Sequence, residues 1–265
     1  MTSELRTLLE AAIDCGRRMG AKALEHYVAH RDTRSLAVEF KGDGSPVSNA
    51  DRDAELVARA FISEYFPGDG VLGEELGELN PGAKRRWCLD PIDGTKSFLG
   101  GAPLWGSLVA VCEGEEVLAG VAVFPATREL IAAAPGQGCI VEGGIAEVST
   151  VDRVDLATVL TTDDRFKEAP ACEAPWRKLA HASRIARTWG DCYGYYLVAT
   201  GRAEVMSDGI LSPWDAACLQ PIIEEAGGVF TDWEGKRTWF GRGVLATNRA
   251  LARTAREILG VPVSA

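Results

Sequence analysis

The order of apolar segments constrains the fold of this 265-residue chain more than any other feature. Between residues 107 and about 150, short apolar runs such as SLVAVCEGEE and LAGVAVFP are interrupted by glycines, a pattern that predicts a meander of antiparallel strands. After residue 151, predicted strands such as TVLTTD alternate with predicted helices. The helices are expected at 175–185, 190–201, 213–226 and 248–259. We therefore expect an α+β fold in which an α+β half (1–150) packs on an α/β half (151–265).

The first hundred residues combine two predicted helices with two short predicted strands. Apolar residues recur at helical spacing over residues 3 to about 30, which is typical of an amphipathic helix. The Gly/Pro turn KGDGSPVSNAD (41–51) leads to Ser48, which we expect to cap a second helix that ends at FPGDG. The runs VLGEE and RWCLD then predict short buried strands.

The composition is that of an ordinary globular protein with an acidic balance. Hydrophobic residues make up 46% of the chain and charged residues 25%, and the formal net charge is -10. A nucleic acid is therefore not an expected partner, because contacts to its backbone need clusters of Lys and Arg. An acidic protein that binds a phosphorylated substrate needs metal ions to offset the repulsion between the charges.

Cysteines and apolar runs bear on the cellular compartment. The seven cysteines are dispersed, with no CxxC pair and no zinc spacing, so we expect buried, reduced thiols. The sequence MTSELRTLLEAAIDCG lacks the apolar region of a signal peptide, and no run is long enough to span a bilayer. We expect a cytoplasmic protein that does not bind membranes.

Two carboxylates lie three residues apart in the stretch LDPIDGTKSF. Asp90 ends an apolar run, so we expect it to be buried, where an unpaired charge costs several kcal/mol. Asp93 follows closely, and like charges repel unless a cation compensates them. Gly94 allows close approach of the backbone, and the N–H groups of Thr95 and Lys96 at a helix start can bind a phosphate. Mg²⁺ fits this pattern, because it binds through a few carboxylates and substrate phosphate oxygens.

Other acidic residues have structural explanations as well. Asp51 in SNAD and Asp215 in SPWD each stand three residues after a serine, which is the spacing of a helix capping box. Capping is therefore an alternative to chemistry at both positions. The pair Glu74-Glu75, taken alone, is typical of a solvated loop. The three histidines lie outside these clusters, so a metal-activated water fits better than a histidine base.

Taken together, four stretches resemble the inositol monophosphatase-like phosphatases, which are Mg²⁺-dependent and inhibited by lithium. The stretches are SPVSNADRDAE (45–55), GEE (73–75), LDPIDGTKSF (89–98) and PWDAACLQPIIEEAGG (213–228). They occur in the order of the family and span nearly the whole chain. The resemblance implies a homodimer with an alternating αβαβα sandwich, which agrees with the two predicted halves.

The resemblance also implies a role for each matched position. The metal ligands would be Glu74, Asp90, the backbone carbonyl of Ile92, Asp93 and Asp215. Gly94 and Thr95 would bind phosphate through their backbone N–H groups. Asp51 would hydrogen-bond the Thr95 hydroxyl, and this pair together with Glu74 would orient the attacking water.

Two further stretches resemble the histidinol-phosphatase branch of the family, RTWGDCYGYYLVATGRAEV (187–205) and PLWGSLVAV (103–111). Inositol-specific members usually have small residues where GDC stands here. The expected activity is therefore hydrolysis of L-histidinol phosphate to L-histidinol and phosphate, a step of histidine biosynthesis. Asp191 and Asp208 would contact the organic part of this substrate, with capping of a helix near Cys192 as the alternative for Asp191.

Other functions stay open at this point. One is an inositol-1-monophosphatase, or another small sugar or nucleotide phosphatase of the same family. Another is a non-catalytic protein that binds phosphate or metal with the same fold, although the complete set of site residues argues against it. The last motif departs from a regular helix at Pro221, which predicts a kink well after Asp215.

Overall fold

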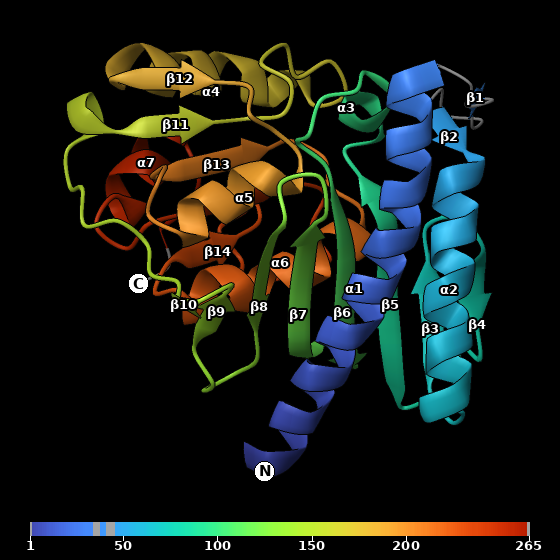
Figure 1. The fold of residues 1–265 in the computed structure, drawn as a ribbon. Helices are drawn as coiled ribbons and strands as arrows, with labels where there is room; N and C mark the ends of the chain where they lie inside the picture. The colour runs from blue at the N-terminus through green and yellow to red at the C-terminus, as the bar shows by residue number, and fades with distance from the viewer. Residues whose placement is uncertain (1, 34–37, 41–45, 264–265) are drawn as a thin grey trace.

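The computed structural model describes residues 2–33, 38–40 and 46–263. Its elements form five layers in the order helix, sheet, helix, sheet, helix (Figure 1). This arrangement confirms the predicted α+β class and the αβαβα sandwich. The helices are α1 (Thr2–Thr33), α2 (Asn49–Tyr65), α3 (Thr95–Leu99), α4 (Pro170–Ala182), α5 (Cys192–Ala199), α6 (Pro213–Glu225) and α7 (Ala252–Leu259), with a 3₁₀ turn at Val154–Leu156.

The larger sheet contains eight strands in the spatial order β10-β9-β8-β7-β6-β5-β3-β4. They are β3 (Gly70–Gly73), β4 (Gly77–Leu79), β5 (Arg85–Asp93), β6 (Gly106–Glu113), β7 (Glu116–Phe124), β8 (Glu129–Ala133), β9 (Cys139–Val141) and β10 (Gly144–Ile145). Neighbours from β5 to β10 are antiparallel, which confirms the predicted meander. The parallel pair β3–β5 aligns Gly73 with Leu89, so the residues that follow them reach the same edge of the sheet.

Helices cover both faces of this sheet, so its central strands are apolar on both sides. Helices α1 and α2 pack on one face and α6 packs on the other (Figure 1). Along β6, Val109 and Val111 belong to the core under α1 and α2, whereas Leu108 and Ala110 belong to the core that contains α6. This alternation with period two is that of a strand buried on both faces.

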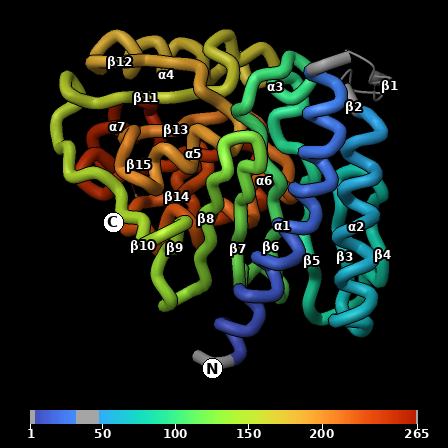
Figure 2. The backbone as a smooth tube through the Cα atoms, viewed as in Figure 1, coloured from blue at the N-terminus to red at the C-terminus, as the bar shows by residue number. Residues whose placement is uncertain are grey.

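The smaller sheet has the order β12-β11-β13-β15-β14 and lies beyond α5 and α6. Its strands are β11 (Thr158–Leu160), β12 (Ile185–Arg187), β13 (Val205–Asp208), β14 (Val229–Thr231) and β15 (Val244–Thr247). Helices α4 and α7 pack on its outer face. Each sheet takes its strands from one side of residue 150, and the chain passes from one to the other along residues 146–157 (Figure 2). One apolar core nevertheless includes residues from both sheets.

Several short elements were not predicted from the sequence. Strand β1 (Val38–Phe40) pairs with β2 (Pro46–Ser48), and β4 and β12 also contain only three residues each. Strands this short carry too little periodicity to be recognised. The predicted turn at 41–51 falls partly on residues 41–45, outside the described residues.

Two helices contain an internal proline. Helix α4 begins at Pro170, before the predicted residue 175, and α6 continues through Pro221 to Glu225. The Pro221 ring packs against Gly120 of β7, where an added Cβ would lie 2.8 Å from the Pro221 Cγ. The close approach of α6 to the sheet therefore depends on this glycine.

Two further properties concern the thiols and the lengths of the helices. All seven cysteines are free, and six of them are buried, which confirms the prediction of reduced thiols in apolar surroundings. None of the helices in the described part of the chain is long and apolar enough to cross a membrane.

Candidate active site

Three carboxylates from distant parts of the sequence meet at one edge of the larger sheet. Glu74 follows β3, Asp90 lies near the end of β5, and Asp215 is in the first turn of α6. One oxygen from each carboxylate lies within 4.8 Å of the other two. We call Glu74, Asp90 and Asp215 the carboxylate trio. Oxygen atoms at this spacing can share a single hard cation.

A local irregularity in β5 directs two carboxylates towards the site. The register between β5 and β6 shifts between Asp90 and Asp93. Asp90 Oδ1 accepts a hydrogen bond from the Ile92 N–H at 2.9 Å, and the Ser107 hydroxyl donates to the Pro91 carbonyl at 2.7 Å. Irregularities of this kind re-aim side chains beside active sites. The irregular turn after WCLD thus orients the side chains of Asp90 and Asp93.

Burial and mutual repulsion raise the pKa of these carboxyl groups. Burial first, and then the charges of Glu74 and Asp215, hold the pKa of Asp90 well above its ordinary value. Burial also raises the pKa of Asp93 and of Asp215 to about 7. No Lys or Arg in the described part of the chain forms an ion pair with Asp90, Asp93 or Asp215. A set of uncompensated carboxylates with only oxygen donors fits a hard divalent cation such as Mg²⁺.

Asp93 lies beside the trio and is held by the other half of the chain. Its Oδ2 accepts a hydrogen bond from the Cys192 N–H at 2.5 Å. Cys192 is the first residue of α5 and is buried. A candidate ligand from β5 is therefore positioned by a helix that begins 99 residues later.

Asp51 and Thr95 do not form the hydrogen bond that the resemblance implied. Asp51 Oδ2 instead accepts hydrogen bonds from the N–H and the hydroxyl of Ser48, both at 2.8 Å. The Thr95 hydroxyl donates to the Ile92 carbonyl at 3.1 Å. Both residues instead form hydrogen bonds with local partners, because each partner lies only three residues away in the chain. Burial raises the pKa of Asp51, and the charge of Glu74 adds to this effect, so Asp51 lies close to the trio.

A residue that caps a helix can also belong to the site. Asp51 completes a capping box with Ser48 at the start of α2. Asp215 Oδ2 likewise accepts a hydrogen bond from the Ser212 N–H at 2.9 Å at the start of α6, while Asp215 belongs to the trio. A cap fixes the carboxylate at a helix start, so it orients Asp215 instead of competing with its second role.

Gly94 occupies a position that no other residue could take without strain. Its φ of 85° is left-handed, and it directly precedes Thr95 at the start of α3. An added Cβ would lie 3.0 Å from the Leu104 carbonyl oxygen and 3.1 Å from Asp191 Oδ2. The glycine is therefore needed both for its conformation and for the close approach of its neighbours.

A cavity of about 230 Å³ adjoins this turn and contains one of the two predicted substrate residues, Asp208. Its walls include Lys96 from α3, Phe166 and Ile210. Asp208 is only 6% exposed, and its carboxylate already accepts hydrogen bonds from the Thr162 N–H at 2.8 Å and the Tyr195 hydroxyl at 3.0 Å. The fold itself thus satisfies this acid.

Asp191, the other predicted substrate residue, has a different environment. It is the N-cap residue, directly before α5, but its side chain makes no capping hydrogen bond. Its φ of 51° and ψ of -156° fall in a region that is almost restricted to glycine. Burial and then the charges of Asp93 and Asp208 hold its pKa well above the ordinary value, against an opposite effect of Lys96. The alternative of helix capping is therefore not supported.

Two residues of the site region were missed by the sequence analysis. Glu55 is completely buried and hydrogen-bonds the turn that carries Glu74. Its spacing of four residues from Asp51 places both on one face of α2, and this signal could have revealed it. The Thr162 hydroxyl accepts a hydrogen bond from the Asp191 N–H at 2.8 Å, and no sequence pattern indicated this contact.

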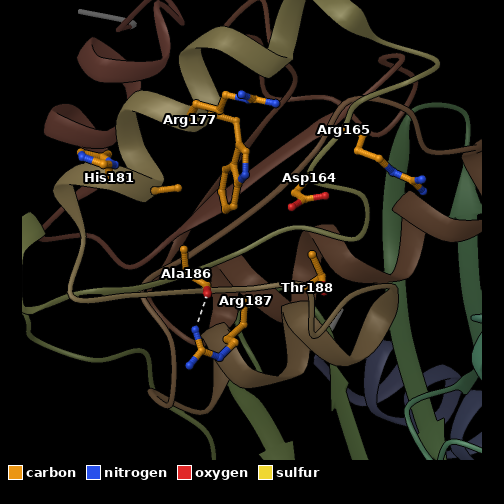
Figure 3. A pocket seen from close by; sticks show the side chains of 9 residues that line it. Asp164, Arg165, Arg177, His181, Ala186, Arg187 and Thr188 are labelled. Carbon is orange, nitrogen blue, oxygen red and sulfur yellow. Dashed lines mark hydrogen bonds between the residues drawn. The ribbon is translucent and has the colours of Figure 1, made fainter.

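A larger cavity, of about 570 Å³, lies between α4 and β12 (Figure 3). Arg177, His181 and Arg187 are among the residues that line it. None of the predicted site residues belongs to it. The size of a cavity therefore does not locate the chemistry in this protein.

Comparison with known proteins identifies the family. The sequence profile of the inositol monophosphatase family matches residues 4–260. The chain belongs to the inositol monophosphatase family. A histidinol-phosphatase from Chlorobaculum parvum is 40% identical over 253 residues, which cover 95% of this chain and 96% of the relative. An inositol-1-monophosphatase from Mesorhizobium japonicum is 31% identical, with 98% of this chain and 97% of the relative covered. The crystal structure of the extragenic suppressor protein suhB from Bartonella henselae superposes with a TM-score of 0.88 at 26% identity, with 96% of this chain and 98% of that chain covered.

Membership of the inositol monophosphatase family makes the chain a phosphoric monoester hydrolase that acts on small phosphorylated molecules. Enzymes of this family depend on metal ions, and the carboxylate trio can hold one. The predicted family, fold and enzyme class are thus confirmed.

Proposed function

We propose that this member of the inositol monophosphatase family is a Mg²⁺-dependent phosphatase that hydrolyses L-histidinol phosphate in histidine biosynthesis. The observation that carries the reaction type is the carboxylate trio, in which one oxygen of each carboxylate lies within 4.8 Å of the other two. Among the residues that the structure describes, no Lys or Arg forms an ion pair with Asp90 or Asp215. The 40% identity to a histidinol-phosphatase along nearly its whole length supports the choice of substrate.

The residues around the turn after β5 have distinct parts in this proposal. The metal would be held by Glu74, Asp90, the Ile92 carbonyl, Asp93 and Asp215. When bound, Mg²⁺ supplies a water that is nucleophilic at neutral pH and stabilises charge on the leaving oxygen. The N–H groups of Gly94 and Thr95 would bind the phosphate, because this left-handed turn brings the backbone close to the site.

We assign the orientation of the attacking water to Glu74, Thr95 and Asp51. If Thr95 and Asp51 act as one unit in the working enzyme, the double variant Thr95→Ala/Asp51→Asn should turn over scarcely more slowly than either single variant. Additive losses would leave Asp51 with the capping role that its bonds to Ser48 display.

Asp191 is the residue that we assign to the charged organic part of the substrate. Histidinol phosphate carries an ammonium group and an imidazole, so its pocket should supply negative charge. The Asp191 carboxylate lies next to Gly94, it is not used as a cap, and its backbone is held in a strained conformation. Strain of this kind persists where the surrounding structure enforces it, and it is common at functional sites. Asp208, the other predicted substrate residue, lines the cavity beside this turn, but Thr162 and Tyr195 already donate hydrogen bonds to its carboxylate.

Phosphate release from a substrate panel tests the proposal. The panel contains histidinol phosphate, inositol 1-phosphate, fructose 1,6-bisphosphate and a 3′-phosphoadenosine nucleotide, each assayed with Mg²⁺ and with EDTA. We expect the highest kcat/KM for histidinol phosphate, no activity in EDTA and full recovery with Mg²⁺. Activity that persists in EDTA would overturn the assigned metal role.

A second candidate is an inositol-1-monophosphatase, which the 31% identity to such an enzyme over 98% of this chain favours. The same panel separates the two, because a preference for inositol 1-phosphate would replace the substrate but leave the metal site intact.

We also propose a homodimer in the cytoplasm. The free state of all seven cysteines supports a reducing compartment. The dimer rests on the family resemblance, and light scattering coupled to gel filtration tests it. A mass near 28.4 kDa would contradict it.

A further inference from the structure

Glu55, on the second turn of α2, places its carboxyl group in the interior of the protein. The residue is 0% exposed. Its Oε2 accepts a hydrogen bond from the Glu75 N–H at 2.8 Å, and its Oε1 accepts hydrogen bonds from the Leu76 N–H at 3.3 Å and Arg59 Nε at 2.7 Å. A buried carboxylate is tolerated only when donors satisfy it, and here two of the three donors belong to the turn after β3.

These two N–H groups directly follow Glu74 in the chain. On the other side, the Glu74 N–H donates to the Leu89 carbonyl of β5 at 3.1 Å. The backbone of Glu74 is therefore held by β5 through its own N–H and by Glu55 through the next two. Arg59 extends the contact, because it bonds Glu55 and also donates to the Gly77 carbonyl. Through Glu55 and Arg59, helix α2 thus holds the turn from Glu74 to Gly77 in place.

Gly73 shows how closely the Glu55 carboxylate approaches the end of β3. An added Cβ at Gly73 would lie 2.0 Å from Glu55 Oε1 and 2.4 Å from its carboxyl carbon. No side chain fits there while Glu55 keeps its place. A helical ion pair between Glu55 and Arg59 alone would not require this contact, since residues four apart meet on the helix surface without any help from a loop.

We propose that Glu55 is a positioning residue for metal binding, which fixes the turn so that the Glu74 carboxylate joins Asp90 and Asp215. Groups that hold a metal ligand in place commonly affect affinity or activity by about 10- to 100-fold when they are changed. The proposal rests on the proposed function in one respect, namely that Glu74 binds the metal.

The first test replaces Glu55 by glutamine, which keeps the shape but turns one accepting oxygen into an NH₂ group. We expect Glu55→Gln to raise the Kd for Mg²⁺, measured by calorimetry on the substrate-free protein, by about 10- to 100-fold. Hydrogen exchange at the Glu75 and Leu76 amides should become faster. The matched control is Glu64→Gln, an exposed acid on the same helix, which should leave both quantities unchanged.

The second test approaches the same contact from the strand. Gly73→Ala should weaken Mg²⁺ binding as Glu55→Gln does, because the new Cβ displaces the Glu55 carboxylate. In a Glu55→Ala background, where the carboxylate is gone, the same Gly73→Ala change should have almost no further effect. This non-additivity identifies the Gly73–Glu55 contact even if Glu55→Ala lowers the overall stability.

The outcomes separate the positioning role from the proposed function. A Glu55→Gln protein that is less stable but binds Mg²⁺ like the wild type would overturn the positioning role, as would unchanged exchange at Glu75 and Leu76. A wild type that binds no Mg²⁺ would refute the metal site and, with it, the role of Glu55 in metal binding.

Discussion

Asp90 of the carboxylate trio and Asp208 are both buried acids near the candidate active site, but their surroundings differ. Asp208 receives hydrogen bonds from Thr162 and Tyr195, so the protein itself satisfies its charge. In the trio, the charges of Glu74 and Asp215 repel that of Asp90 and raise its pKa. An acid whose charge the fold stabilises with hydrogen bonds supports the structure, whereas acids held close together against their mutual repulsion are arranged for a ligand. Asp191, with no capping bond and a strained backbone, belongs with the second kind.

Neutralising one member of the trio should produce the largest effect. We expect Asp90→Asn and Asp215→Asn to lower kcat by at least about 100-fold at saturating Mg²⁺, since a bound metal is worth several kcal/mol of transition-state stabilisation. The free energy of unfolding of the metal-free protein should stay the same or rise, because each change removes a repelling charge. Steady-state kinetics and urea unfolding in EDTA measure the two quantities.

The stability of an Asp208 variant provides the comparison for this test. Asp208→Asn should unfold more easily by about 1–3 kcal/mol, because one of its satisfied donors loses its acceptor. If Asp90→Asn were destabilised as much as Asp208→Asn in EDTA, the distinction between the two kinds of acid would fail.

The second prediction separates Asp191 from Asp208 by substrate. Asp191→Asn should lower kcat/KM for histidinol phosphate by roughly 10- to 100-fold, because a charge-assisted hydrogen bond to an ammonium is worth about 1.5–3 kcal/mol. Hydrolysis of glycerol 2-phosphate, which has no cationic group, should hardly change. Asp208→Asn should instead slow both substrates to a similar degree, as expected for loss of a structural bond. Equal losses on both substrates with Asp191→Asn would assign it a structural role too.

The third prediction concerns the pH dependence of stability without metal. Asp93 and Asp215 have a pKa of about 7 in the fold, against an ordinary value of 3.8. The folded protein therefore binds more protons than the unfolded chain between about pH 4 and pH 7, and its free energy of unfolding should fall as the pH rises through this window. The pKa of Asp90 is raised as well, so it acts in the same direction.

Thermal unfolding in EDTA at pH 5 and pH 8 checks this expectation. The metal-free protein should have the higher Tm at pH 5, and Asp215→Asn should reduce the difference. Mg²⁺ should raise the Tm mainly at pH 8, where the carboxylates are ionised. A metal-free protein that is more stable at pH 8 would contradict the assignment of repulsion to this site.

Most of the fold could be predicted from the sequence because its signals are local, whereas the grouping of Glu74, Asp90 and Asp215 into one site was implied by the family resemblance. Alternating apolar runs indicated the meander, and the apolar run before Asp90 indicated a buried acid. Partners that are distant in the sequence could not be predicted in this way. The bond from Cys192 to Asp93 and the bonds from the turn after Glu74 to Glu55 depend on how layers pack. The Asp51–Thr95 hydrogen bond was predicted but is not formed, because Ser48 and Ile92 are nearer in the chain and bind these residues instead.

The smallest expected effect concerns the strain at Asp191. Its φ of 51° with ψ of -156° suits glycine, so Asp191→Gly should relieve strain of about 1–3 kcal/mol, partly offset by the greater entropy of glycine in the unfolded chain. We therefore expect a gain of about 1 kcal/mol in the free energy of unfolding, measured by urea denaturation in EDTA. The same variant should lose activity on histidinol phosphate as Asp191→Asn does. The matched control is Asp163→Gly, a change in the cavity wall at an exposed ion pair with Arg165, which should bring no gain in stability. If Asp191→Gly were less stable than the wild type, the carboxylate would hold the fold together, and Asp191 would have to be grouped with Asp208 instead of with the trio.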